Sequence, residues 1–300
     1  MFGINIYYFL SGLLAFIPAI IWLSIIFRKN KNKKLQILIF LGGIFSVLPI
    51  FALQLIFLNF PDLDFVTNLN KQIADPYFKF LILYLWVGIS EELIKQWLVR
   101  FIDNRYLLIQ TINDSIQFSL ISALGFAFAE NIFYFYQIWT QIGIQAFFVA
   151  FIFRSAITTC AHLIFSGFFG YYYGMAKFSI NIVEQSEIEG NKFRSSKFIA
   201  KLLNISKIEA YRDQRILKGL FIAIILHCSY DFLLQFNFII PSILLVVLGY
   251  IILQKLLKNK ASNLILVNDK DNQKISSMAK TDEDTVIELL GMWFKEKKFV

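Results

Sequence analysis

Long runs of apolar residues, separated by short polar segments, dominate this chain. A helix needs about 20 such residues to cross a hydrocarbon core of roughly 30 Å, and about seven runs are long enough. We therefore predict an all-α fold, a polytopic transmembrane helix bundle of about seven spans. The predicted spans are residues 5–27, 35–59, 77–98 and 115–139, a fifth that begins near 151, then 220–236 and 238–257.

The fifth apolar run is too long for one simple span. It extends from Gln145 to Phe178, about 34 residues where about 20 suffice to cross the bilayer. We therefore expect an interfacial or re-entrant turn before a span that starts near Phe151. If this segment is split in two, the number of spans becomes eight.

Basic residues gather in two of the connecting segments. Residues 28–34 carry five Lys or Arg side chains, and residues 177–218 contain a second basic stretch. The positive-inside rule predicts that both segments are cytoplasmic, which places the N-terminus outside and the C-terminus in the cytoplasm. Residues 60–76 are acidic and rich in turn formers, as expected of an extracytoplasmic loop.

This pattern divides the chain into two regions. Residues 1–259 form the predicted transmembrane helical domain, with a motif core at about 77–236 and a basic cytoplasmic loop at 177–218. Residues 260–300 form a cytoplasmic tail in which 281–284 resemble a capping box. Apolar side chains then repeat at helical spacing, which predicts an amphipathic helix lying on the membrane or the protein body. These apolar positions are Val286, Leu289, Leu290, Trp293 and Phe294.

Composition excludes a soluble globular domain. The chain is 57% hydrophobic and 17% aromatic, whereas ordinary domains are about 45–50% apolar. The net charge of +8 does not indicate a nucleic-acid partner, because the basic residues are confined to loops. The lipid bilayer is the expected partner. Cys160 and Cys228 both lie in apolar runs and suggest no disulfide framework.

Eight ionisable residues lie inside the predicted spans. Each must have a reason, because an ionisable side chain at the bilayer centre costs about 2.5–3.5 kcal/mol. Snorkelling or a helix-end ion pair explains a single Lys or Glu, but the chain has only 2 histidines and both belong to this set. We interpret the set as a functional site. Its members are Glu91, Glu92, Lys95, Glu130, Arg154, His162, His227 and Asp231.

Helical spacing relates several of these side chains. Glu91 and Lys95 are one turn apart on one face, whereas Glu92 is rotated by about 100° from Glu91. Only one of the two glutamates can then occupy a given central point. We expect the other to pair with a cation such as Lys95 or Arg154.

The final pair, His227 and Asp231, stands at i and i+4 on one helix face, so the Asp can orient the His. A carboxylate near neutral histidines can act as general base on water, and His or Asp donors can stabilise an oxyanion. This set therefore predicts peptide hydrolysis. The same residue types also ligate zinc, although no HExxH motif is present. A serine nucleophile would be Ser90, Ser166 or Ser229, but Ser229 lies off the face of His227. Cys228 also lies off that face, whereas a pair of Cys160 with His227 across helices stays open.

Three motifs resemble those of the PrsW-type intramembrane proteases. Residues 91–95 read EELIK and resemble the EExxK motif, residues 126–131 read FAFAEN and resemble FxxxE(N), and residues 227–231 read HCSYD and resemble HxxxD/N. Arg154 and His162 fall in the fitting intermediate span. The resemblance covers about half of the chain, with one motif per span, and it implies a wider relation to CAAX prenyl endopeptidases and bacterial abortive-infection proteins.

The resemblance implies roles for these residues. A water would be activated by Glu91 or Glu92 with help from His162, while His227 and Asp231 would form or orient the oxyanion-stabilising part. Glu130 stands where CAAX relatives carry a histidine, which favours the PrsW branch. The implied catalytic set is Glu91, Glu92, Glu130, His162, His227 and Asp231, with Lys95, Asn131 and Arg154 as supporting residues. If a metal such as zinc is present, its expected ligands are His162, His227 and either Glu91 or Glu92.

The resemblance also implies a substrate and a location. The expected substrate is a membrane-anchored protein such as an anti-sigma-factor-like regulator, and the expected location is the inner (plasma) membrane. Two alternatives use the same residues or regions differently. Buried Glu, His, Asp and Arg also form the proton relays of transporters and channels. A non-catalytic sensor or scaffold would instead dock a partner through the tail and the basic loop.

Overall fold

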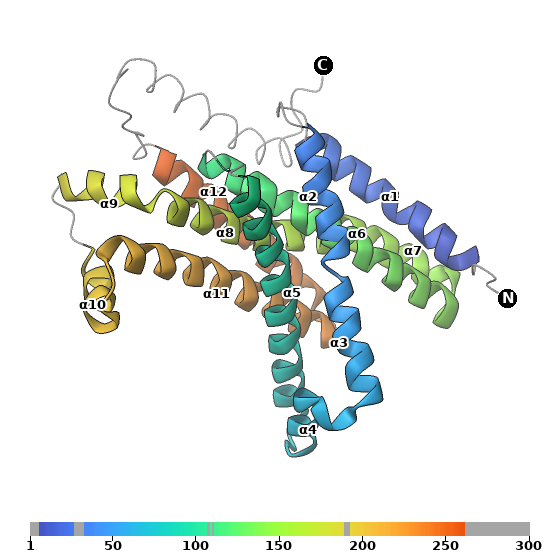
Figure 1. Cartoon of the computed structure of the whole chain (residues 1–300). Helices are drawn as coiled ribbons and strands as arrows, with labels where there is room; N and C mark the ends of the chain where they lie inside the picture. The colour runs from blue at the N-terminus through green and yellow to red at the C-terminus, as the bar shows by residue number, and fades with distance from the viewer. Residues whose placement is uncertain (1–5, 27–32, 107–108, 110, 189–192, 262–300) are drawn as a thin grey trace.

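In the computed structural model, every regular element within the described part of the chain is a helix (Figure 1). The prediction of an all-α, polytopic membrane protein is confirmed. The predicted tail helix and the basic residues 28–31 lie outside the described residues. The residues that the structure describes are 6–26, 33–106, 109, 111–188 and 193–261.

The helices follow one another with short connections. The first part of the chain contains α1 (Ile6–Ile26), α2 (Lys33–Phe45), α3 (Leu48–Asn59), a 3₁₀ turn η2 (Pro61–Leu63), α4 (Phe65–Lys71) and α5 (Pro76–Tyr106). The second part contains α6 (Ile112–Gln141), α7 (Ile144–Phe153), the π-helical η3 (Arg154–Thr158), α8 (Thr159–Lys177), α9 (Ser179–Ile188), α10 (Arg194–Leu203), α11 (Lys207–Gln235) and α12 (Ile239–Ala261).

Six of the described helical segments are long and apolar enough to cross a membrane, judged by length and composition. The remaining long helix, α5, has 31 residues but carries the charged residues of the EELIK motif. The count of seven spans and their orientation stay predictions. The six segments are Ile6–Ile26, Lys33–Asn59, Ile112–Gln141, Ile144–Lys177, Lys207–Gln235 and Ile239–Leu256.

One expectation about the connections was wrong. Residues 144–177 are helical throughout, so the predicted turn before Phe151 is replaced by the π-helical segment η3. A π segment leaves a main-chain carbonyl without its usual partner, and here the carbonyl of Ser155 accepts a hydrogen bond from Trp22 Nε1 at 3.1 Å. The predicted basic loop at 177–218 contains α9, α10 and the first turns of α11. The segment is too polar to show long apolar runs, so the hydrophobic pattern did not predict these helices.

Two of the helices that carry the candidate site have well-defined starts. At α6, Thr111 Oγ1 accepts from the Asp114 amide at 3.1 Å, and Asp114 Oδ2 accepts from the Thr111 amide at 2.9 Å. At α11, Ser206 and Glu209 form the same reciprocal arrangement at 3.1 and 3.0 Å. Capping boxes of this kind satisfy amide groups that the first helical turn leaves free.

The contacts between helices bring four of them together at one point. In the interior, α6 packs against α1, α2 and α8, α8 packs against α11, and α11 packs against α5. Figure 1 shows α5 crossing α11, while α3, α4 and the first half of α5 extend away from the rest of the bundle. The middle sections of α5, α6, α8 and α11 therefore surround a common point.

The crossing of α2 and α6 depends on two glycines. A Cβ atom at Gly125 would lie 2.2 Å from the main-chain oxygen of Phe40, and one at Gly43 would lie 2.2 Å from that of Ser122. Small residues let transmembrane helices approach this closely. We expect Gly125→Ala to destabilise the protein by about 1–3 kcal/mol through overpacking, seen as a lower Tm in detergent. Gly12→Ala is the control, because its Cβ would meet no atom within 4 Å; equal Tm values for the two variants would contradict the crossing.

Candidate active site

The predicted site residues meet at one buried point between four helices. Glu92 comes from α5, Glu130 from α6, His162 from α8 and His227 from α11. Glu92 is fully buried, and the two histidines are 3% and 2% exposed. The centroids of the imidazole rings lie 5.1 Å apart in an edge-to-face arrangement. Residues that are up to 135 positions apart in sequence thus lie in one buried cluster.

Lys95 lies at the centre of this cluster. Its Nζ atom is 3.0 Å from Glu92 Oε1, 3.3 Å from Glu91 Oε2 and 3.1 Å from His162 Nδ1. It also lies 4.0 Å from the centroid of the Phe126 ring. The expected pairing of one glutamate with a cation is present, because Glu92 contacts Lys95, and Glu91 contacts the same lysine as well. A lysine side chain is long enough to reach carboxylates at both i−3 and i−4 on its own helix.

The two adjacent glutamates have different surroundings. Glu92 is held by three further donors: Gln96 Nε2 at 3.2 Å, Ser166 Oγ at 3.4 Å and His227 Nδ1 at 3.0 Å. Among the described residues, Glu91 contacts Lys95 at 3.3 Å and His227 Nε2 at 3.6 Å, and 11% of its side chain is exposed. Glu91 is therefore the glutamate with free acceptor capacity and an open side.

Glu130 forms a second ion cluster beside the first. Its Oε2 atom is 3.0 Å from both Arg154 Nη2 and His162 Nε2. Arg154 Nε donates to Asn131 Oδ1 at 2.8 Å, and its guanidinium lies 3.7 Å from the centroid of the Tyr134 ring. Arg154 thus pairs with Glu130 rather than with Glu91 or Glu92. The reason is that its side chain extends from the π-helical segment toward α6, the helix that carries Glu130.

The last predicted residue, Asp231, lies at the open side of the site. Its Oδ2 atom is 3.3 Å from His227 Nε2, so the expected i, i+4 contact is present. The side chains of Asp231 and Glu130 are 24% and 19% exposed, and that of Arg154 is 12% exposed. These residues mark the direction from which water or a substrate can approach, whereas Glu92 and Lys95 close the opposite side.

Glu91, His162 and His227 form a group that fits a metal ion. One ligand atom from each lies within 4.8 Å of the other two. Two histidines and a glutamate are the protein ligands of many catalytic zinc sites. Two further carboxylates also fit a metal site. Glu92 contacts His227 Nδ1 and Glu130 contacts His162 Nε2, and carboxylates that contact metal-binding histidines in this way orient the rings.

Three residues that contact the site were not predicted in these roles. Gln96 and Ser166 contact Glu92, and the Tyr134 ring contacts Arg154. Gln96 and Tyr134 each stand four positions after a predicted glutamate, so helical spacing offered a signal. Ser166 was considered as a nucleophile, but its hydroxyl lies in hydrogen-bonding distance of Gln96 and Glu92. Cys228 faces the Leu81 carbonyl at 4.0 Å, away from the two imidazoles.

Comparison with known proteins agrees with this geometry. A family model described as PrsW family intramembrane metalloprotease matches residues 31–193, more than half of the chain. Protease PrsW of Shouchella clausii (strain KSM-K16) is 25% identical over 228 residues, which are 74% of this chain and 82% of that relative. No solved structure matches the chain significantly. The chain is therefore a multi-pass membrane protease that belongs to the PrsW family of intramembrane metalloproteases.

Proposed function

We propose that this protease hydrolyses a peptide bond of a membrane-anchored protein with a water molecule activated at Glu91. One observation carries the proposal: Glu91 is an acceptor on the open side of a buried cluster that contains both histidines of the chain. A carboxylate screened from bulk water can take the proton of an attacking water. Family membership favours this activity over the proton-relay and scaffold alternatives.

The other residues position the reacting groups. Glu92 accepts a hydrogen bond from His227 Nδ1, which leaves Nε2 of that ring directed toward Glu91 and Asp231. Glu130 holds Nε2 of His162 and also holds Arg154 at the open side, where the guanidinium N–H groups of Arg154 can stabilise the oxyanion that forms on the attacked carbonyl. Glu92 and Glu130 are therefore positioning residues in this proposal, and Glu91 is the base.

A divalent metal fits the same site. Glu91, His162 and His227 would hold it; with such an ion bound, Lewis-acid polarisation would make the water more acidic, and Glu91 would serve as a ligand in place of its role as base. We expect about one zinc per chain in protein purified without chelators, and a loss of most of it in the double variant His162→Ala, His227→Ala. Elemental analysis by mass spectrometry measures this without an activity assay. The control is Glu187→Gln, an exposed carboxylate on α9; equal zinc contents in all three proteins would exclude these ligands.

The substrate class follows from the depth of the site. The cluster lies among apolar helices and opens only beside Asp231, Glu130 and Arg154, so a protein chain that already lies in the membrane reaches it most readily. A single-span regulator of the anti-sigma-factor kind, in the inner membrane, matches this chemistry and the family. With the orientation predicted from the basic segments, the closed side would face the cytoplasm.

New protein termini provide the test. Membrane-protein N-termini would be compared by terminal-peptide mass spectrometry in cells that carry the wild type or the double variant Glu91→Gln, Glu92→Gln at matched levels. We expect a small set of termini to disappear in the variant, which also identifies the substrate. The double variant Glu187→Gln, Glu209→Gln removes two exposed carboxylates as control. Coinciding profiles under several stresses would refute the proposal, and pH-dependent flux in proteoliposomes would then favour a transporter.

A further inference from the structure

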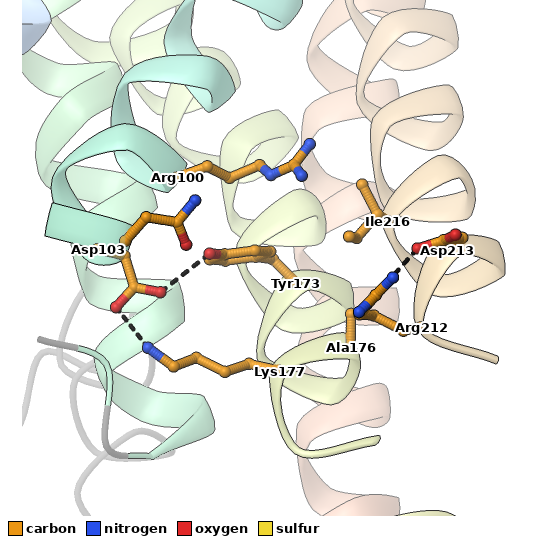
Figure 2. Close-up of a pocket in the computed structure, with 9 residues that line it drawn as sticks. Arg100, Asp103, Tyr173, Ala176, Lys177, Arg212, Asp213 and Ile216 are labelled. Atoms are coloured by element: carbon orange, nitrogen blue, oxygen red, sulfur yellow. Dashed lines mark hydrogen bonds and ion pairs between the residues drawn. The ribbon is translucent and has the colours of Figure 1, made fainter. Parts of the chain in front are cut away.

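A second polar cavity lies between α5, α8 and α11, away from the candidate active site (Figure 2). Its volume is about 380 Å³. Arg100 on its wall lies about 12 Å along α5 from Glu92, at 1.5 Å per residue. Its lining combines three cations with two carboxylates, namely Arg100, Lys177, Arg212, Asp103 and Asp213.

One wall of the cavity is fixed by a buried carboxylate. Asp103 is 2% exposed and accepts hydrogen bonds from Tyr173 at 2.9 Å, Lys177 Nζ at 2.5 Å and the Ile109 amide at 3.0 Å. The charge of Lys177 is thereby balanced. A charged carboxylate that accepts three hydrogen bonds is held in place and has few acceptor positions left for a ligand.

The guanidinium groups of Arg100 and Arg212, which also line the cavity, are held less firmly than Asp103 and Lys177. Arg100 interacts with the hydroxyl of Tyr173 but, among the described residues, has no carboxylate within salt-bridge distance. Figure 2 shows its side chain extending past Tyr173 toward Ile216 on α11. Arg212 pairs with its neighbour Asp213 at 3.0 Å, and both side chains are about half exposed. Such exposed pairs contribute little and exchange readily. The cavity therefore offers two planar, positively charged forks from opposite walls.

Exposed apolar side chains flank the cavity on both of these helices. Trp97 and Phe101 lie within one turn of Arg100 on α5, with their rings stacked at 5.4 Å, and both are exposed. Leu217 and Phe221 are exposed on α11, one to three turns beyond Arg212. A ligand that combines an anionic head with an apolar body matches this surface better than a free anion does.

We propose that this cavity binds the phosphate group of an anionic phospholipid headgroup. Guanidinium forks recognise phosphate oxygens in pairs, and basic pockets between transmembrane helices on the cytoplasmic side bind anionic headgroups. The cavity lies where α5 and α8 end and α11 begins, and we expect this end of the helices to lie at the level of the lipid headgroups. A headgroup held by Arg100 and Arg212 also links α5 to α11, the helices that carry Glu91 and His227.

Lipid binding to the full-length protein tests the proposal. Short-chain phosphatidylglycerol would be titrated into wild type, Arg100→Gln/Arg212→Gln and the control Lys197→Gln/Lys201→Gln, each in phosphatidylcholine nanodiscs, with retained lipid counted by native mass spectrometry. The control removes two exposed charges from α10, outside the cavity. We expect the cavity variant to bind roughly thirtyfold more weakly, since each basic side chain near an anionic group contributes about fivefold. The control should change by less than about twofold, because both of its lysines lie outside the cavity.

Three outcomes would overturn the proposal. Equal losses in the cavity variant and the control would show general attraction to charge. Binding of inorganic phosphate with the same residue dependence, and no retention of phosphatidylglycerol, would make free phosphate the ligand. Unchanged lipid binding with cleavage lost only in the cavity variant would assign the cavity to an acidic protein segment. Should the glutamine variant not purify as a monodisperse protein, Arg100→Lys/Arg212→Lys replaces it, and unchanged affinity in that variant would exclude recognition by guanidinium forks.

Discussion

Glu91→Gln is expected to lower the rate of substrate cleavage by about 10²–10⁴-fold, the usual contribution of a positioned general base. Glutamine keeps the shape of the side chain but cannot take a proton from water. Stability should change little, because Glu91 contacts Lys95 and His227 at 3.3 and 3.6 Å, whereas Glu92 contacts the same two residues at 3.0 Å. The measurement is single-turnover cleavage of a membrane-anchored substrate in proteoliposomes, with Tm recorded for the same preparations.

The neighbouring substitution Glu92→Gln is the matched control. Glu92 is fully buried and contacts Lys95, Gln96, Ser166 and His227. Its loss should lower Tm as well as activity, since it leaves a buried cation short of one partner. Full activity in Glu91→Gln together with none in a well-folded Glu92→Gln protein would reverse the two roles.

The convergence of the site could be predicted from energetics and helical spacing. Ionisable groups at bilayer depth require compensation, and Glu91, Glu92, Glu130, His162 and His227 all lie in one cluster in the structure. Spacing along a single helix also predicted the contact of His227 with Asp231. Contacts between helices, such as Glu92 with His227, could not be predicted because apolar periodicity does not fix how one helix is rotated against another.

Uncharged polar contacts gave a weaker signal. Gln96 and Ser166 are buried and contact Glu92, but amides and hydroxyls inside a span are tolerated more readily than charges. The π-helical segment also had no signal in the sequence. On a regular helix Arg154 and His162 would be about 12 Å apart along the axis, yet both reach Glu130 Oε2, because the π turn changes the register and the arginine side chain is long.

Lys95→Met is expected to destabilise the protein by about 3–5 kcal/mol, the usual effect of removing one partner from a buried ion pair. Lys95 is fully buried and is the cation within salt-bridge distance of both Glu91 and Glu92. Methionine has a similar length but leaves the Glu92 carboxylate without that cation. Unfolding in detergent, followed by tryptophan fluorescence, measures the change. Lys79→Met is the control on the same helix, and equal stabilities of the two variants would contradict a charged cluster.

The double variant Lys95→Met, Glu92→Gln separates charge balance from packing. If the stability lost in Lys95→Met comes from an uncompensated carboxylate, neutralising Glu92 should restore part of it, giving a coupling energy of about 0.5–3 kcal/mol in a double-mutant cycle. If the loss comes from the contact between Lys95 and the Phe126 ring at 4.0 Å, the two substitutions should add. Activity should stay low in either case, because His162 Nδ1 and Glu91 both lose the Lys95 contact that orients them. Recovery of stability without activity would therefore indicate that the fold tolerates a neutral cluster and that hydrolysis requires the charged one.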